Sequence, residues 1–104
     1  LADAQIRGGQ AAQAVAGVRR MIDTRSADPR LWQLLSRGQA ELGQRTEQHR
    51  AQAEVYVLRG SLPAAIEQLE IARRAGDGDF YTLSAVDARL RELQQRLLEE
   101  RRER

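Results

Sequence analysis

The sequence predicts an all-α domain in which antiparallel helix pairs stack as a solenoid. Strong helix formers (Ala, Leu, Gln, Glu and Arg) dominate its 104 residues, and two prolines and eight glycines interrupt them. No stretch alternates apolar and polar residues between turn signals, as a half-buried strand would. We therefore expect one domain over residues 1–104, cut from a longer chain, with residues 99–104 frayed.

Glycines and prolines divide the chain into six expected helices. The first, residues 1–7, would be a short remnant ended by Gly8-Gly9. The second should span about residues 10–25, because its apolar residues recur at three- and four-residue spacing. That spacing predicts one buried face, formed by Ala14, Val15, Val18, Met21 and Ile22.

Asp28-Pro29 predicts the start of the third helix, since an aspartate N-cap followed by proline satisfies a helix N-terminus. This helix should end at Gly43 and bury Leu31, Leu34, Leu35, Gly38 and Leu42. The fourth helix should span about residues 46–59 and turn Ala53, Tyr56 and Val57 inward.

Gly60 should end the fourth helix in a left-handed conformation, where a Cβ would be costly. Ser61 is then placed to cap the fifth helix, with Pro63 in its first turn. The buried face of the fifth helix should comprise Leu62, Ala65, Ile66, Leu69 and Ala72.

A long sixth helix, about residues 80–102, should follow the loop at 75–78 and be capped by Asp79. Its apolar residues form a heptad seam, which is too short to indicate a coiled coil: Leu83, Val86, Leu90, Leu93 and Leu97. We expect a capping helix that packs within the chain, beginning with Phe80. A homodimer seam is the less favoured alternative.

The spacing of small and large residues over 53–72 predicts a repeat. Small and aromatic residues, a turn glycine, and then small, large and small residues follow the tetratricopeptide pattern: Ala53, Tyr56, Gly60, Ala65, Leu69 and Ala72. A poorer register begins at Pro29, with Trp32, Leu35, Ser36 and Gly43 near the expected places. Both registers claim the helix at 46–59, so two groove assignments stay open.

The stretches "YVLRG", "AIEQLEIA" and "GDFYTLSAVDARLREL" resemble the C-terminal segment of bacterial zinc metallopeptidases that carry an HExxH motif and tetratricopeptide repeats. The resemblance covers about residues 29–93. It implies a non-catalytic module for protein or substrate binding, a periplasmic location, and a role in quality control of outer-membrane proteins. Zinc would lie in a separate catalytic domain. Without the resemblance, a cytoplasmic, generic repeat scaffold that self-associates through its last helix is the alternative.

Charge distribution, hydropathy and histidine content argue against three other classes of function. Seventeen arginines and 15 acidic residues are interleaved along the chain, whereas nucleic-acid binders concentrate positive charge. No apolar run approaches the roughly 20 residues of a membrane span. A zinc site of the HExxH type needs two histidines, and His49 is the sole histidine. We therefore expect no cofactor, no catalytic residue, no nucleic-acid partner and no membrane insertion.

Several single residues have a structural interpretation that we favour over a functional one. His49 should be a packing residue, and Trp32 should belong to the core more readily than to an interface. Asp77 and Asp79 suit a turn and a cap better than a calcium site. Two surface ion pairs are expected at four-residue spacing: Asp87–Arg91 and Glu92–Arg96.

The expected ligand is a protein or an extended peptide. The first helix of each tetratricopeptide pair lines the groove, so its polar residues should meet that ligand. In the better register these residues are Glu47, Arg50 and Glu54, with Leu58 beside them. In the earlier register they are Arg30, Gln33 and Arg37. The arginines could hold acidic or backbone groups by charge-assisted hydrogen bonds.

Overall fold

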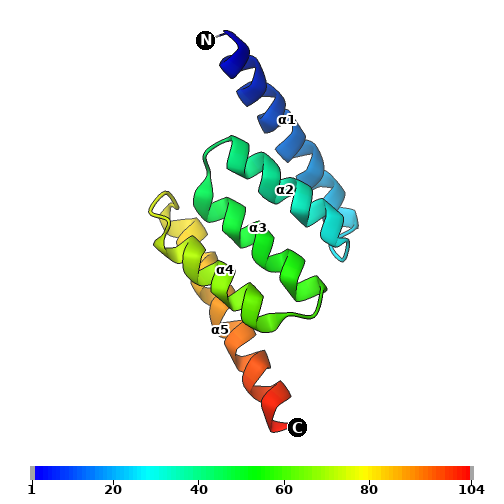
Figure 1. Cartoon of the computed structure of the whole chain (residues 1–104), viewed down its shortest axis with the longest axis vertical. Coiled ribbons are helices and arrows are strands. Elements are labelled where there is room, and N and C mark those ends of the chain that lie inside the picture. The colour runs from blue at the N-terminus through cyan, green and yellow to red at the C-terminus, as the bar shows by residue number, and fades with distance from the viewer. Residues whose placement is uncertain (1, 104) are drawn as a thin grey trace.

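Over the residues that the structure describes, the chain folds into five helices that zigzag from one end of an elongated body to the other (Figure 1). The computed structural model describes the backbone of residues 2–103 and the side chains of residues 9–103. Its extents are 55 × 28 × 19 Å. The helices are α1 (Ala2–Thr24), α2 (Pro29–Glu41), α3 (Arg45–Leu58), α4 (Leu62–Arg74) and α5 (Phe80–Arg102).

Each helix packs against the next, and α5 also touches α3. No Cα atom of α1 comes within 8 Å of one in α3, among the residues described. Successive antiparallel helices therefore stack as predicted, in an all-α, tetratricopeptide-like arrangement. The backbones of α1 and α3 therefore stay apart, with α2 between them.

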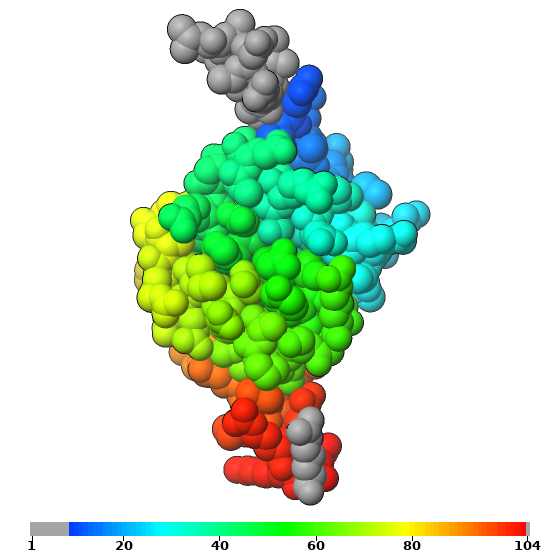
Figure 2. Space-filling model, viewed as in Figure 1, coloured from blue at the N-terminus to red at the C-terminus, as the bar shows by residue number. Residues whose placement is uncertain are grey.

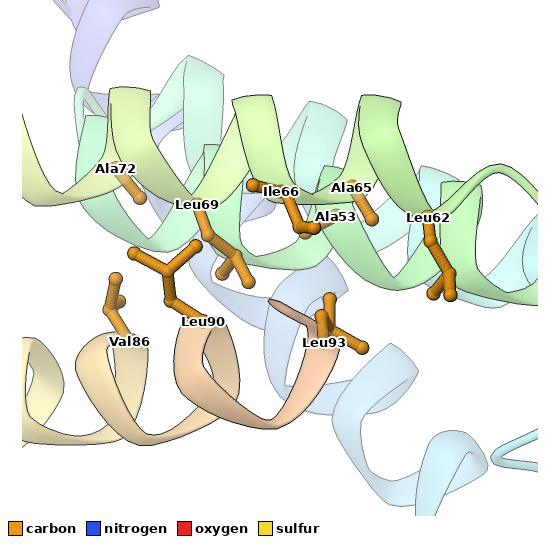
Figure 3. Close-up of a cluster of buried hydrophobic side chains, with 9 residues drawn as sticks. All are labelled: Ala53, Leu62, Ala65, Ile66, Leu69, Ala72, Val86, Leu90 and Leu93. Atoms are coloured by element: carbon orange, nitrogen blue, oxygen red, sulfur yellow. The ribbon is translucent and has the colours of Figure 1, made fainter. Parts of the chain in front are cut away.

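Two apolar cores share α3. Ala51 (2% exposed) faces the core with α1 and α2, which contains Val15, Ile22, Leu31 and Leu35. Ala53 (0% exposed) faces the other core, which α4 and α5 complete (Figure 3). That core contains five residues of α4, which are the buried face predicted for the fifth expected helix, and three residues of α5. They are Leu62, Ala65, Ile66, Leu69, Ala72, Val86, Leu90 and Leu93.

Positive-φ glycines end three of the helices, as predicted for Gly43 and Gly60 and for the break at 75–78. Gly60 (φ +81°) closes α3 in a Schellman motif. The Ser61 N–H donates to the Tyr56 carbonyl (2.9 Å) and the Gly60 N–H to the Val57 carbonyl (3.1 Å). This tight reversal sets α4 antiparallel to α3.

The predicted break at Gly8-Gly9 is wrong, so the described residues form five helices instead of six. Helix α1 runs without interruption from Ala2 to Thr24, while Leu1 lies outside the described residues. A glycine costs about 1 kcal/mol in a helix and does not by itself end one. The surrounding alanines and glutamines supply enough helix propensity to continue.

Four side chains predicted to be buried lie at the surface. Ala14 is exposed, and Met21 and Leu34 are 44% and 49% exposed. Each lies at the margin of an apolar stripe, beside the residues that the neighbouring helix buries. Phe80 is 87% exposed, because its position at the start of α5 precedes the part of that helix that meets α4.

The cap predictions hold, with one difference. Asp28 Oδ1 accepts the Arg30 N–H (2.9 Å) and Asp79 Oδ1 accepts the Thr82 N–H (2.7 Å). Ser61 occupies the N-cap position of α4, but its side chain makes no capping hydrogen bond. At the other end, α5 continues to Arg102 and its last turns project beyond the body (Figure 2). Fraying of residues 99–104 stays a prediction.

Replacing Ala65 by leucine should destabilise the fold, because Ala65 is fully buried where α4 meets α3 and α5. A larger side chain must push these helices apart, at a cost of roughly 1–3 kcal/mol. Ala40→Leu, on the exposed side of α2, is the matched control and should change stability by less than about 0.5 kcal/mol. Urea denaturation checks both, and equal midpoints would contradict this packing.

Replacing glycine by alanine should stabilise the fold at one position and destabilise it at another. Gly9→Ala lies in a helix with open space around its added Cβ, so it should stabilise by about 0.5–1 kcal/mol. Gly60→Ala also meets no atom, yet its left-handed backbone should make it destabilising by about 1–2 kcal/mol. Thermal unfolding followed by circular dichroism measures both, and a stabilising Gly60→Ala would refute the left-handed turn.

Candidate functional site

A hollow lies on the side of the molecule where α1, α3 and α5 face one another. Its volume is about 630 Å³, within the usual range for ligand sites. The backbones of α1 and α3 stay apart here, and side chains of α2 line the floor between them. We call this hollow, with the smaller one described below, the groove.

The floor of the groove is apolar, and its side chains come from four helices. Ile22 of α1, Trp32 and Leu35 of α2 and Ala51 of α3 belong to the first core or pack against it. Ala85 and Ala88 continue the surface on α5. Small residues on two helices leave room for a polypeptide to approach the backbone.

Trp32 serves both the core and the groove. It packs against the first core, as predicted, and its indole N–H donates to the Ser26 carbonyl (2.8 Å). This hydrogen bond fixes the ring, which also lines the groove. An interface role for Trp32 therefore does not compete with its packing role.

Ion pairs cross the groove from wall to wall. Arg19 of α1 reaches Glu47 of α3 (3.2 Å), and Arg50 approaches the same carboxylate (3.4 Å). The buried amide of Gln39 joins this cluster when its oxygen faces Arg19 (3.0 Å) and its nitrogen faces the Glu47 carbonyl (2.8 Å). Polar contacts thus connect two helices whose backbones do not meet.

Arg89 makes the corresponding connection between α3 and α5. Its Nε and one terminal nitrogen donate to the two carboxylate oxygens of Glu54 (3.0 and 2.8 Å). The other terminal nitrogen contacts Glu92 (3.0 Å). The Glu54 hydrogen bonds raise the pKa of Arg89, so this guanidinium remains charged. The bidentate geometry holds α5 at a defined angle to α3.

The two predicted pairs on α5 form differently. Asp87 lies 3.7 Å from Arg73 of α4 instead of pairing with Arg91, and Glu92 pairs with Arg89 instead of Arg96. Both observed pairs are themselves partly exposed, so each contributes little to stability.

The six predicted ligand-binding residues separate into two groups. Glu47, Arg50 and Glu54 of the better register all line the groove. Arg30, Gln33 and Arg37 lie exposed on α2 and are not among its lining residues. Arg30 pairs with Asp28, and the Gln33 amide oxygen accepts from Arg59. Whether either set touches a ligand stays a prediction.

A second hollow of about 370 Å³ adjoins the first and shares Arg19, Glu47 and Arg50 with it. It ends at the loop between α4 and α5, where Asp77, Asp79 and Tyr81 line it. Sequence reasoning assigned this loop to a cap and a turn, and did not connect it with the groove.

Asp77 caps α3 from this loop, across more than 30 residues. Its carboxylate accepts the N–H groups of Arg45 (2.6 Å) and Thr46 (2.9 Å) and the Thr46 hydroxyl (2.6 Å). Gln44, the N-cap residue of α3, makes no side-chain cap. A Cβ on Gly78 would lie 2.9 Å from Thr46 Cγ2, so the glycine permits this close docking. The end of the groove is thereby held rigidly.

His49 is a packing residue, as predicted. It is half-buried, and its Nδ1 lies 2.8 Å from Gln68 Oε1 on α4.

No group of three or more potential metal ligands occurs among the residues described. An HExxH zinc centre takes two histidines, and the sequence has one. No helix in the described part has the length and apolarity of a membrane span.

Comparison with known proteins identifies a relative. Over 95 residues, 91% of the chain, it is 34% identical to the beta-barrel assembly-enhancing protease of Escherichia coli (strain K12). Proteins of the same name from Shigella flexneri and E. coli O157:H7 match equally. The chain spans 20% of the length of these relatives. It is related to one portion of this protease. No family model and no solved structure matches.

Loss of the Asp77 cap should weaken the fold. Asp77→Ala removes the acceptor for three donors at the start of α3, so at pH 7 it should cost roughly 0.5–2 kcal/mol. Glu100→Ala, exposed on the projecting part of α5, is the control. Urea midpoints measure the difference, and an unchanged midpoint for Asp77→Ala would contradict the cap.

The effect of Asp77 should depend on pH in a defined direction. The Thr46 hydroxyl, followed by the Thr46 N–H, lowers the pKa of Asp77 in the folded protein. A lowered folded pKa gives stability that is present above the unfolded pKa of about 3.9 and is lost as pH falls through the folded value. The difference in unfolding free energy between the wild type and Asp77→Ala should thus stay constant from neutral pH to about pH 5 and shrink below about pH 4. A gap that widens in acid would overturn this assignment.

Proposed function

We propose that this chain is a protein-binding module of a protease related to the beta-barrel assembly-enhancing protease, and that it holds extended polypeptide segments in the groove. The observation that supports this most strongly is the groove itself. An apolar floor lies between charged walls supplied by α1, α3 and α5, and two of its walls are braced by ion pairs. Such a floor holds apolar side chains, while the walls offer hydrogen-bonding groups to a peptide backbone.

The proposed module is itself non-catalytic. Its one histidine is engaged with Gln68, and the zinc that the resemblance implies would be held elsewhere in a longer protein. The proposed location is the periplasm, and the proposed segments come from outer-membrane proteins. The name of the relatives, which mentions assembly of beta-barrels, is consistent with this class of ligand.

The alternative of a scaffold that self-associates through α5 loses its main support. Val86, Leu90 and Leu93 of the seam are buried against α4 within the same chain. The apolar side chains of α5 that stay accessible lie near its two ends: Phe80 and Tyr81 at the start, and the half-buried Leu97 with Leu98 (50% exposed) towards the end. They do not form one continuous seam along the helix, so the heptad pattern no longer supports a dimer interface.

Filling the groove should abolish peptide binding. Ala88 is exposed and lines the groove, so Ala88→Trp places a large ring in the ligand's path without disturbing a core. Ala40→Trp, on the exposed surface of α2 outside the groove lining, is the matched control. The probes are fluorescent peptides tiled along the strands of an outer-membrane β-barrel protein, and fluorescence anisotropy measures their affinity.

Some of these peptides should bind the wild type and the control equally. Ala88→Trp should bind them at least about tenfold more weakly, a difference of about 1.4 kcal/mol. Equal affinity for all three proteins would place recognition on another surface. An absence of binding to any peptide would refute the proposed function.

A further inference from the structure

The charge of the groove opposes that of the whole chain. Six carboxylates and three guanidiniums line its two hollows, a net of three negative charges: Asp23, Glu47, Glu54, Asp77, Asp79 and Glu92 against Arg19, Arg50 and Arg89. The complete chain carries a formal charge of +2. The N-termini of α3 and α5 each add roughly half a positive charge at the second hollow. About two negative charges remain.

The arginines in the groove are already satisfied within it. Arg19 and Arg50 share Glu47, while Arg89 binds both Glu54 and Glu92. An acidic ligand would have to break these pairs and would also meet the surplus carboxylates. The sequence-based expectation that arginines hold acidic groups of the ligand is therefore disfavoured by the geometry.

Asp23 is the carboxylate best placed to receive a cation. It makes no ion pair or hydrogen bond among the interactions of the described side chains, and it lines the same hollow as Trp32. The Trp32 ring is held by its hydrogen bond to Ser26. A lysine or arginine side chain here gains an ion pair with Asp23 and a cation–π contact with the ring.

The far end of the groove has two exposed aromatic residues. Tyr81 (80% exposed) lines the second hollow, and Phe80 (87% exposed) is its neighbour in sequence. The chain has four aromatic residues of the Phe, Trp and Tyr types, so two of them stand in solvent at this corner. The Asp79 cap and the docking of Asp77 on α3 hold the corner rigid. Aromatic side chains contribute large contact areas at interfaces, so these two residues offer apolar area to a ligand leaving the second hollow.

We propose that the groove selects extended polypeptide segments in which lysine or arginine alternates with apolar residues, and that such a segment leaves the groove across Tyr81 and Phe80. This inference rests on the proposed function and specifies its ligand. The two hollows adjoin at Arg19 and Glu47, with Trp32 in the first and Tyr81 in the second, so a segment that fills both must pass over this ion pair. Apolar side chains occupy the floor and the aromatic corner, and cationic side chains neutralise the surplus carboxylates.

Three synthetic peptides test the charge preference. They have the same alternating apolar residues with lysine, glutamine or glutamate between them, and both ends are blocked. At about 0.1 M salt the lysine peptide should bind at least about tenfold more tightly than the glutamate peptide. The ratio should fall towards one at about 1 M salt, since the Debye length shortens from about 10 to about 3 Å. Anisotropy gives the affinities, and Trp32 emission reports occupancy of the floor.

Two pairs of variants locate the selection. Asp23→Asn should reduce the lysine-to-glutamate ratio, whereas Glu100→Gln, an exposed acid on α5 outside the groove lining, should leave it unchanged. Phe80→Ser combined with Tyr81→Ser should weaken all three peptides about fivefold, as expected for lost aromatic contacts. Leu98→Ser, an exposed apolar residue on the same helix, is its control. Melting curves verify that each variant is folded.

The outcomes separate this inference from the proposed function. Peptides that bind regardless of charge, and that Ala88→Trp still excludes, would overturn the selectivity but leave the function intact. An unchanged affinity after loss of Phe80 and Tyr81 would overturn the path across the corner. A peptide-free dimer that the same double substitution abolishes would assign the corner to a second copy of the chain, against the proposal. If no peptide binds, both the function and its specificity fail.

Discussion

The two buried faces of α3 are the constraint on which the other elements depend. Ala51 and Ala53 are two residues apart, so they point to different sides of the helix, and each is buried in a separate core. Because both are alanines, α2 and α4 can approach α3 closely from either side. Between these two buried faces, the side of α3 that lines the groove carries Glu47, Arg50 and Glu54. The groove is therefore a consequence of how α3 packs.

Ion pairs and hydrogen bonds connect the helices that apolar packing does not bring into contact. Helix α1 belongs to the first core through α2, yet its backbone stays clear of α3. Arg19 and Glu47 span that opening, Arg89 and Glu54 brace the opposite wall, and Asp77 fixes the loop at the end. Each contact joins segments that are distant in sequence. Together they hold the walls of the groove at a fixed separation while the floor remains apolar.

Local signals in the sequence predicted most of the fold. The Asp28-Pro29 start, the left-handed Gly60 and the buried face of α4 follow from steric rules that act within a few residues. The pairing of Arg89 with Glu54 and of Asp77 with Thr46 could not be predicted, since no local rule relates residues 31 to 35 positions apart. Gly8-Gly9 was misjudged because propensity is a sum over many residues, and strong helix formers on both sides outweigh two glycines.

The same distinction explains why the acidic groove was missed. Along the sequence, arginines and acids are interleaved and nearly balanced, which predicts a mixed, solvated surface. Folding brings four carboxylates and three guanidiniums of α1, α3 and α5 to the first hollow, an excess of one negative charge. Asp77 and Asp79 add to this excess for a structural reason, since helix N-termini attract carboxylates as caps. Capping and packing requirements thus produce a surface whose charge differs in sign from that of the chain, and the groove's ligand preference follows from the positions of the helix ends as much as from its walls.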